Sequence, residues 1–469
     1  PRSEHGITIR LRAGRYYMNE PLLLRPEDSG TAESPLVVCG EEGTVICGDQ
    51  RQQHKELWPR EGMERMLGFD TEKRAITIAT PPKNVLKQLL KENHLEMVVH
   101  QRWAIAILRV KALDVRGDSV VVTFLEPESR LEFEHPWPQP VIGGEKGSSA
   151  FLLRTTEQRD GVEQLVVVGG TDGQRVSHIR FENITFEKTC WNRPLHRGHV
   201  TLQGGMPLVD AYKLKEHEGL PWDASLENQA WVERPVAAVS VSHASQVSFE
   251  GCTFRQLGAT ALDFIDDTDS CCVTGCTFSD IGGTAIMAGS FAESPREVHR
   301  PYDDLACRTR HLTISRNTIS HATTEDWGAV AIGCGYVSDT EISHNSIDHV
   351  NYSGICVGWG WTAKETGMEH NLICGNEVKD YALQLYDTGG IYTLSNQPGS
   401  VIRDNVIGTP GPAPYATNAR AFRIYLDART DGFILQNNQT EQGKPLRRSD
   451  IGDNQPGPIT VADLQNVAK

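Results

Sequence analysis

Asn345-Ser346-Ile347 opens a unit of sequence that recurs throughout the stretch from residue 183 to residue 438. Each unit begins with Asn or Cys, carries Ile, Val or Phe two residues later, and continues through a Gly-rich link into a second apolar strand. Where nothing is inserted, the period is 24 to 33 residues. A period of this length is typical of a solenoid built from one coil per repeat. The other openings are Asn183-Ile184-Thr185-Phe186, Cys252-Thr253-Phe254, Cys276-Thr277-Phe278, Asn317-Thr318-Ile319, Asn376-Glu377-Val378, Asn405-Val406-Ile407 and Asn438.

The second half of each unit places an aliphatic residue at a fixed distance from the next opening. That distance is 14 residues from Leu262, from Ile391 and from Ile424. The segments alternate apolar and polar residues and are rich in Val, Ile, Phe and Thr, which indicates strands and not helices. The sequence therefore predicts an all-β chain, a right-handed parallel β-helix whose coils stack about 4.8 Å apart.

The opening Asn has a structural task in such a fold. At a corner that tolerates left-handed backbone, its side-chain amide can bond to the Asn of the next coil. Cys252 and Cys276 occupy the same position in their units. We expect them to be small buried residues of this ladder, without thiol chemistry.

The chain divides into three zones. Residues 1–50 contain short strands that we expect to be the opening coils. Residues 51–165 lack the repeat and carry a predicted helix (85–90) and strands (103–110 and 120–124), which indicates an inserted β-rich module. Residues 166–469 form the main β-helix, and its longer excursions, such as 187–235, are expected to wall a cleft on one face.

Composition excludes several classes of function. The net charge is −15 and no Lys/Arg cluster follows the chain, which argues against nucleic acid as a partner. No stretch of eighteen apolar residues is present to span a membrane. The 11 cysteines include no CxxC pair, so we expect no metal ion and no cofactor. The oligomeric state and a signal peptide cannot be read from the chain.

Strand alternation assigns the residues that follow the inward aliphatics to the outer face. The middle coils carry Gly there, which predicts a bare trough, whereas the last two coils carry Tyr392, Tyr425 and Asp427, with Trp359 and Trp361 nearby. Aromatic faces beside a carboxylate suit a sugar ring. The alternative is that these aromatic residues only cover their neighbours.

Cleavage of a glycosidic bond requires two carboxyl groups. Asp387, the pair Glu325-Asp326, and Asp263 with Asp266-Asp267 are the candidates to partner Asp427. Asp263 is five coils from Asp427, about 24 Å by strand spacing, whereas Asp387 is on the adjacent coil. On straight strands Asp387 and Asp427 would still be about seven residues, or roughly 23 Å, apart. Gly389-Gly390 permits a bend that would bring Asp387 back.

Several of these segments resemble glycoside hydrolase family 141, a family of β-helix enzymes that act on plant cell-wall glycans. The similarity covers nearly the whole chain and includes the inserted module. It implies a carbohydrate substrate, activity of the α-L-fucosidase or xylanase type, a catalytic pair at Asp387 and Asp427, and a secreted or periplasmic location. The segments are His100-Gln101-Arg102-Trp103, Asn183-Ile184-Thr185-Phe186 through Trp191-Asn192-Arg193-Pro194, Gly282-Gly283-Thr284-Ala285-Ile286, Asp387-Thr388-Gly389-Gly390-Ile391-Tyr392-Thr393-Leu394 and Ile424-Tyr425-Leu426-Asp427.

Supporting roles follow from position. An outward Arg423 would bind an acidic sugar or keep Asp427 ionised, or else form an ion pair with Asp404 or Asp431. Glu325, Trp327 and His349 are expected to line the same groove or to be exposed corner residues.

Two other functions stay open. One is a polysaccharide lyase or pectinase on the same scaffold, with Asp266, Asp267 and Asp269 near calcium. The other is a carbohydrate-binding β-helix without catalysis.

Overall fold

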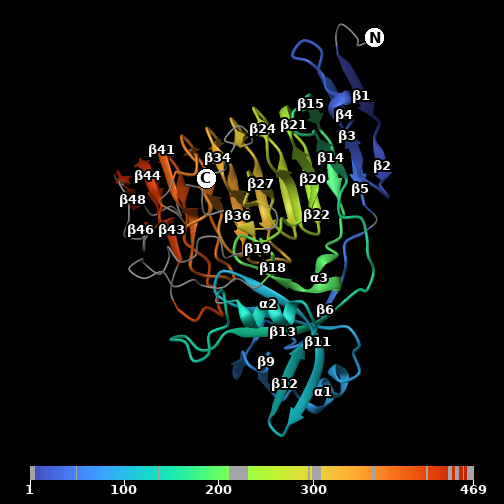
Figure 1. Ribbon diagram of the computed structural model, residues 1–469, viewed down its shortest axis with the longest axis vertical. Helices are drawn as coiled ribbons and strands as arrows, with labels where there is room; N and C mark the ends of the chain where they lie inside the picture. Colours follow the sequence, from blue (N-terminus) through green and yellow to red (C-terminus); the bar gives the residue numbers. More distant parts are fainter. Residues whose placement is uncertain are drawn as a thin grey trace.

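The computed structural model describes residues 6–48, 50–135, 137–210, 231–293, 296–297, 308–361, 363, 365–418, 421–441, 446–448, 454–457 and 459–461. Three long parallel sheets run through these residues, and successive coils add one strand to each sheet. Figure 1 shows the strands stacked along a shaft, with a separate module packed against one side of it. The predicted parallel β-helix is therefore confirmed.

The ten-stranded sheet carries the candidate site. Its strands are β3 (Leu22–Leu24), β14 (Val166–Gly169), β20 (Ala237–Ser242), β23 (Thr260–Phe264), β27 (Ile286–Ala288), β33 (Ile332–Cys334), β37 (Ile355–Val357), β40 (Thr388–Thr393), β43 (Ala421–Leu426) and β46 (Leu446–Arg448).

The eleven-stranded sheet holds the strands that open each repeat. They are β2 (Gly14–Tyr17), β5 (Thr44–Cys47), β16 (Thr185–Glu187), β22 (Thr253–Leu257), β26 (Thr277–Ile281), β32 (Thr318–Ala322), β36 (Ser346–Val350), β39 (Glu377–Val378), β42 (Val406–Ile407), β45 (Asn438–Thr440) and β48 (Ile459–Val461).

The fourteen-stranded sheet closes the coil. Its main path is β1 (Ile7–Leu11), β4 (Leu36–Gly40), β15 (Val176–Glu182), β21 (Ala244–Glu250), β25 (Cys272–Thr274), β31 (Thr313–Ser315), β35 (Glu341–Ser343), β38 (Leu372–Cys374), β41 (Asn396–Arg403), β44 (Asp431–Gln436) and β47 (Gln455–Pro456). Three short strands lie beside this path: β24 (Thr268–Asp269), β30 (Thr309–Arg310) and β34 (Val337–Ser338).

The inserted module is an antiparallel sheet with two helices. Its elements are β6 (His54–Trp58), β7 (Glu64–Arg65), β8 (Gly68–Asp70), β9 (Ala75–Ala79), α1 (Lys83–Leu89), β10 (Leu95–His100), β11 (Ile105–Arg116), β12 (Ser119–Phe124), α2 (Glu128–Glu134) and β13 (Ala150–Thr156). A later strand, β17 (His199–Val200), pairs with β11 and ties the excursion after β16 to the module. The helix expected over 85–90 is α1, whereas α2 was not anticipated.

The remaining described elements are short. They are a 3-10 turn (Pro26–Asp28), α3 (Arg193–Arg197), β18 (Leu208–Asp210), β19 (Trp231–Val232), β28 (Ala292–Glu293) and β29 (Arg296–Glu297). The longest described helices, α1 and α2, have 7 residues each, too few to cross a membrane.

The Asn ladder forms as predicted. Asn317 donates from its side-chain amide to the Oδ1 of Asn345 at 3.0 Å, and Asn345 donates in the same way to Asn376 at 3.0 Å. The ladder continues through Asn405 to Asn438. These buried amides satisfy backbone carbonyls as well as one another, which fixes the corner of each coil. Cys252 and Cys276 are 1% exposed, and their thiols lie against backbone carbonyls.

The core of the shaft follows the predicted register. Leu262 pairs with Ile286, and the line of pairs continues through Ile332, Ile355, Ile391 and Ile424. All of these side chains are fully buried. Rings stack in the earlier coils, with centroids 4.6 Å apart between Phe254 and Phe278.

The outer face of the ten-stranded sheet is covered, which corrects the prediction of a bare trough. Met287 is 1% exposed and packs in one hydrophobic cluster with residues of the module such as Leu108 and Phe151. Charged contacts reinforce the interface: Arg51 binds Asp280 at 2.6 Å. The module therefore closes part of the face that the sequence alone suggested was open.

Candidate active site

Asp387 ends the turn that leads into β40, and the inserted module holds this turn from the side. His100 donates from Nε2 to the Gln384 carbonyl at 2.9 Å, and the Tyr386 amide donates to the Arg102 carbonyl at 3.1 Å. Burial lowers the pKa of His100 to about 4, so the ring is neutral near pH 7. Asp387 has a φ of 61°, a left-handed conformation that Asp tolerates well. The module thus fixes the backbone that presents this carboxyl group.

Asp427 directly follows β43, and the neighbouring coil holds its backbone. Its amide donates to the Thr393 carbonyl at 3.0 Å. Its Oδ2 accepts a hydrogen bond of 2.6 Å from the hydroxyl of Tyr392. The same hydroxyl accepts a hydrogen bond of 3.0 Å from the side-chain amide of Gln203, so the proton of Tyr392 is directed to Asp427.

Tyr392 stays protonated in this position. It is 3% exposed, and burial, followed by the charge of Asp427, raises the pKa of its phenol well above the usual value. A neutral phenol that donates to a carboxylate stabilises the negative charge. The contact therefore places a neutral hydrogen-bond donor on the Asp427 carboxyl group.

Two tyrosines on adjacent coils connect the two carboxyl groups. Tyr425 pairs with Tyr392 in register, and their rings meet edge to face with centroids 5.2 Å apart. The Tyr425 hydroxyl donates to Oδ1 of Asp387 at 3.4 Å. Although the strand register separates Asp387 from Asp427 by seven positions, the long tyrosine side chains and the turn at Asp387 link the carboxyl groups through one chain of contacts.

Tyr352 joins this chain of contacts from the preceding coil. It is 1% exposed, and its hydroxyl donates to the Asp387 carbonyl at 3.2 Å. Burial, and then the electrostatic effects of Cys356, Asp387 and Asp427, raise its pKa well above the usual value. Sequence reasoning missed Tyr352 and Gln203, because one lies in a turn and the other in an excursion, and neither belongs to a repeated pattern.

The aromatic residues expected to form a sugar platform are mostly buried. Tyr392 and Tyr425 are each 3% exposed and hold the carboxyl groups. Trp359 is 2% exposed and packs edge to face on Phe291, at 5.2 Å, and on Trp361, at 4.8 Å. Trp359 is a core residue and not an open platform, because the module covers this face. Trp361 is half-buried beside the two tyrosines and keeps its place as a candidate substrate contact.

Arg423 is buried and not an open anion-binding group. It is 5% exposed, and its guanidinium reaches the Thr409 hydroxyl at 3.4 Å. Its charge also acts on the buried Tyr381, whose pKa is raised by burial and partly lowered again by Arg423. Asp404, one of the two carboxylates suggested as a partner for Arg423, forms an ion pair of 2.6 Å with Arg403.

Glu325 is an interface residue between the module and the shaft. It binds Arg51 at 2.9 Å, His54 at 2.8 Å and Arg154 at 3.6 Å. Burial alone would raise its pKa, but His54, Arg154 and Arg51 outweigh this effect and lower the pKa to about 2. Trp327 is half-buried nearby, in the cluster that also holds Tyr352.

His349 lies on β36 in the eleven-stranded sheet and not in the sheet of the two aspartates. It is exposed, and its ring stacks on His321 of the preceding coil. Within the described part of the chain, a set of three side chains close enough to share a metal ion occurs once, at His321, Asp348 and His349.

The earlier acidic cluster is neutralised by cations. Asp267 binds Arg175, and Asp269 binds Arg310 at 2.9 Å. Asp263 is 1% exposed and receives two hydrogen bonds of 2.6 Å from Arg234. These contacts pair Asp267 and Asp269, which the sequence suggested near calcium, and Asp263, which the sequence suggested as a partner for Asp427.

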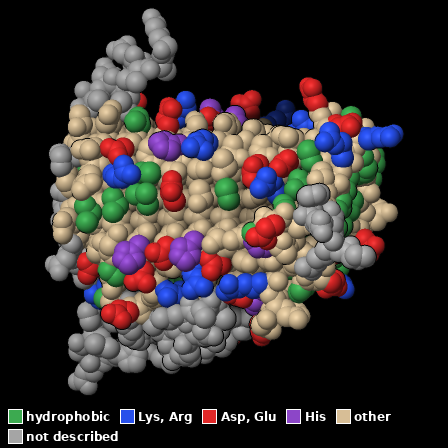
Figure 2. Space-filling model, turned by 90° about the horizontal axis from the view of Figure 1, so that it is seen from above, with side chains coloured by type: hydrophobic (Ala, Val, Ile, Leu, Met, Phe, Trp, Pro, Cys, Tyr) green, Lys and Arg blue, Asp and Glu red, His purple; other side chains and the backbone are tan. Residues whose placement is uncertain are grey.

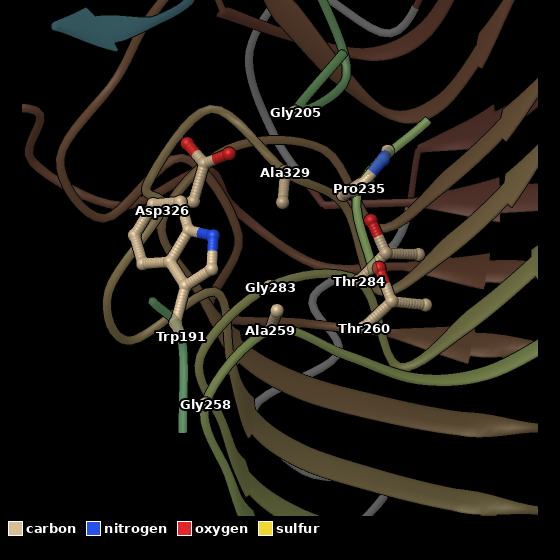
Figure 3. A pocket seen from close by; sticks show the side chains of 10 residues that line it. All are labelled: Trp191, Gly205, Pro235, Gly258, Ala259, Thr260, Gly283, Thr284, Asp326 and Ala329. Carbon is tan, nitrogen blue, oxygen red and sulfur yellow. The ribbon is translucent and has the colours of Figure 1, made fainter. Parts of the chain in front are cut away.

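A recess on the earlier coils is enclosed by the loop after β17. Figure 3 shows the Trp191 ring beside the Asp326 carboxylate, with Thr260 and Thr284 on the opposite side. Trp191 is 7% exposed and Asp326 is 4% exposed, and Asp326 binds the buried His199 at 2.9 Å. Asp326 is buried and bound to His199, whereas Asp387 and Asp427 are only partly buried, so the chain of contacts at Asp387 and Asp427 is the better candidate for catalysis.

Comparison with known proteins agrees with this geometry. Residues 47–159 match the family model described as the GH141 insertion domain, and residues 236–444 match the right-handed β-helix region. A solved structure titled "Glycoside hydrolase" is 31% identical, with a TM-score of 0.89, and the match covers 99% of this chain and 90% of that one. This chain belongs to the glycoside hydrolases and is a GH141-like parallel β-helix protein. As a member of the glycoside hydrolases it is a glycosidase.

Two other solved structures match at much lower sequence identity. A structure titled "The complex structure of XylC with xylose" is 10% identical over 94% of this chain and 65% of that chain, with a TM-score of 0.44. The lacto-N-biosidase of Eubacterium ramulus, from family GH136, is 10% identical over 97% of this chain and 62% of that chain, with a TM-score of 0.38. No curated protein sequence matches this glycosidase.

Proposed function

We propose that this glycosidase hydrolyses a glycosidic bond with Asp387 and Asp427 as its two carboxyl groups, and that its substrate is a plant cell-wall glycan of the α-L-fucoside or xylan type. The observation that carries the proposal is the pair of buried tyrosines, Tyr392 and Tyr425, that joins the two carboxyl groups. Glycoside hydrolysis needs two such groups on either side of the scissile bond.

The hydrogen bonds support different roles for the two aspartates. Asp427 accepts a hydrogen bond of 2.6 Å from a neutral phenol, whereas the corresponding contact to Asp387 is 3.4 Å long. The shorter bond stabilises a charged carboxylate more. Asp387 then acts as the general acid, and Asp427 acts as the nucleophile or as the base that activates water.

The charge on the surface gives no support to a polyanion-binding role. On the face in Figure 2, acidic and basic side chains are interspersed. The whole chain carries a net charge of −15. A neutral glycan fits this surface better than nucleic acid does.

The test compares wild type with Asp387→Asn and Asp427→Asn on xylans, fucosylated oligosaccharides and pectic side chains. Each variant keeps the shape of the side chain, so we expect unchanged folding and a loss of at least about a thousandfold in kcat, on the order of 4 kcal/mol. Asp404→Asn is the control, because Asp404 is exposed and shares the left-handed backbone, with a φ of 57°.

The products separate the proposal from its alternatives. New reducing ends support hydrolysis, and NMR of the first-formed anomer then distinguishes a nucleophilic Asp427 from a base. An unsaturated uronate would indicate a lyase, and binding without turnover would indicate a carbohydrate-binding protein. Full activity in Asp427→Asn would remove this residue from the mechanism.

A further inference from the structure

His321 and His349 form a stacked pair of imidazoles on neighbouring coils, away from the candidate active site. Their ring centroids are 4.4 Å apart and the ring planes differ by 9°. Both residues are exposed, and both have left-handed backbone, with φ of 55° and 54°. Two imidazoles held face to face on neighbouring coils can offer their ring nitrogens to one shared cation.

A carboxylate completes the cluster. His349 donates from Nδ1 to Oδ1 of Asp348 at 2.6 Å, and the Ser320 hydroxyl donates to the same oxygen at 2.6 Å. That hydroxyl lies 2.8 Å from Nδ1 of His321 and accepts a hydrogen bond from it. One potential ligand atom from each of His321, Asp348 and His349 lies within 4.8 Å of the other two.

The strand ladder holds these groups in place before any ligand arrives. Ser320 pairs with Asp348, and Ala322 pairs with Val350, so the coils are in register on both sides of the histidines. A site carried by paired strands is more rigid than one carried by a loop. Two imidazoles and one carboxylate are ligands that Zn²⁺ and its neighbours in the transition series prefer, whereas Mg²⁺ and Ca²⁺ prefer oxygen alone.

We propose that His321, His349 and Asp348 bind one divalent transition-metal ion, which bridges two coils of the β-helix. Water completes the coordination at this exposed position. The proposal does not depend on the glycosidase mechanism. A metal ion that links the coils stabilises the folded state by binding to it and not to the unfolded chain.

The position gives the metal ion a structural consequence for the enzyme. His349 is three residues before Tyr352, whose hydroxyl binds the Asp387 carbonyl. The intervening Asn351 donates from its backbone amide to the Thr323 hydroxyl at 3.0 Å and from its side chain to the Thr323 carbonyl at 2.8 Å. The ion would therefore link the two coils at the start of the turn that supports the candidate general acid.

The experiment measures Zn²⁺ binding by calorimetry on protein freed of metal with a chelator. We expect one equivalent to bind to wild type, and His321→Asn, His349→Asn and Asp348→Asn each to weaken binding by about tenfold or more. Asn is the chosen replacement for the histidines because it tolerates left-handed backbone. His344→Asn is the matched control: His344 is exposed and has a φ of 55°, but it is outside the cluster.

Further arms keep the test decisive. Zn²⁺ should raise the unfolding temperature of wild type and of His344→Asn but not of the His321→Asn/His349→Asn double variant, and Mg²⁺ should have no effect on any of them. Lys379→Gln should tighten Zn²⁺ binding, because the charge of Lys379 acts on Asp348 from the next coil. Equal Zn²⁺ affinity in wild type and in the double variant, with both folded by circular dichroism, would overturn the proposal.

Discussion

Tyr392→Phe removes one oxygen from the candidate active site and leaves the ring in place. In wild type this hydroxyl donates to Asp427 at 2.6 Å and accepts from Gln203 at 3.0 Å. The variant therefore loses the hydrogen bond from Tyr392 to the Asp427 carboxyl group. It also leaves the Gln203 amide, which is 8% exposed, without its hydroxyl acceptor.

The size of the effect follows from these contacts. A hydrogen bond to a charged group contributes about 1.5–3 kcal/mol, which corresponds to a loss of roughly 10- to 150-fold in kcat/KM. The unpaired Gln203 amide should also lower the free energy of unfolding by about 1–3 kcal/mol.

Steady-state kinetics across pH and chemical denaturation measure the two effects separately. Tyr381→Phe is the control: Tyr381 is fully buried inside the shaft, and its hydroxyl donates to the Phe422 carbonyl at 2.7 Å. We expect this variant to lose stability with little change in kcat/KM. If Tyr392→Phe kept kcat/KM within twofold of wild type, the role assigned to Tyr392 would be wrong.

Two further predictions concern the scaffold. Glu325→Gln should lower the free energy of unfolding by about 2–3 kcal/mol at pH 7. The pKa of Glu325 is about 2 in the folded state and 4.5 in the unfolded chain, so its contribution to stability is present above pH 4.5 and is lost as the pH falls toward 2. A stability difference from wild type that stayed constant between pH 7 and pH 3 would contradict this prediction. Asn376→Ala removes the acceptor of the backbone and side-chain amides of Asn345 and the donor to Asn405. We expect it to lower the free energy of unfolding by about 2–4 kcal/mol, measured by denaturant unfolding. Gln439→Ala, at an exposed position, is the control, and an equal effect of the two variants would refute the contribution of the ladder.

The shaft could be predicted from the sequence because its rules are local and repeated. Each coil places an Asn amide or a small Cys at the Asn345 position and an aliphatic side chain at the Ile391 position, so both the ladder and the register of the core are specified once per repeat. The covered outer face could not be predicted in the same way. Met287 and Tyr392 are apolar or aromatic at outward positions, and this pattern fits a sugar platform as well as an interface with another module.

The candidate pair illustrates a different limit. Strand spacing alone separates Asp387 from Asp427 by a distance too long for catalysis, and the sequence offered only the glycines after Asp387 as a remedy. In the structure the connection depends on two tyrosine side chains, whose hydroxyl groups lie far from their own backbone. Reach of this kind depends on side-chain rotamers and on what packs behind each ring, which a strand pattern does not specify.

The two candidate carboxyl groups are also positioned by different insertions. His100 and Arg102 of the module hold the turn before Asp387, whereas Gln203, from the excursion after β16, orients the hydroxyl that binds Asp427. The excursion in turn pairs with the module through β17 and β11. The separation of the carboxyl groups therefore depends on how the module docks on the shaft. Changes at the docking interface, such as the loss of the Glu325 ion pairs, should alter kcat as well as stability, because a displacement of about 1 Å at a reacting group can cost about a hundredfold in rate.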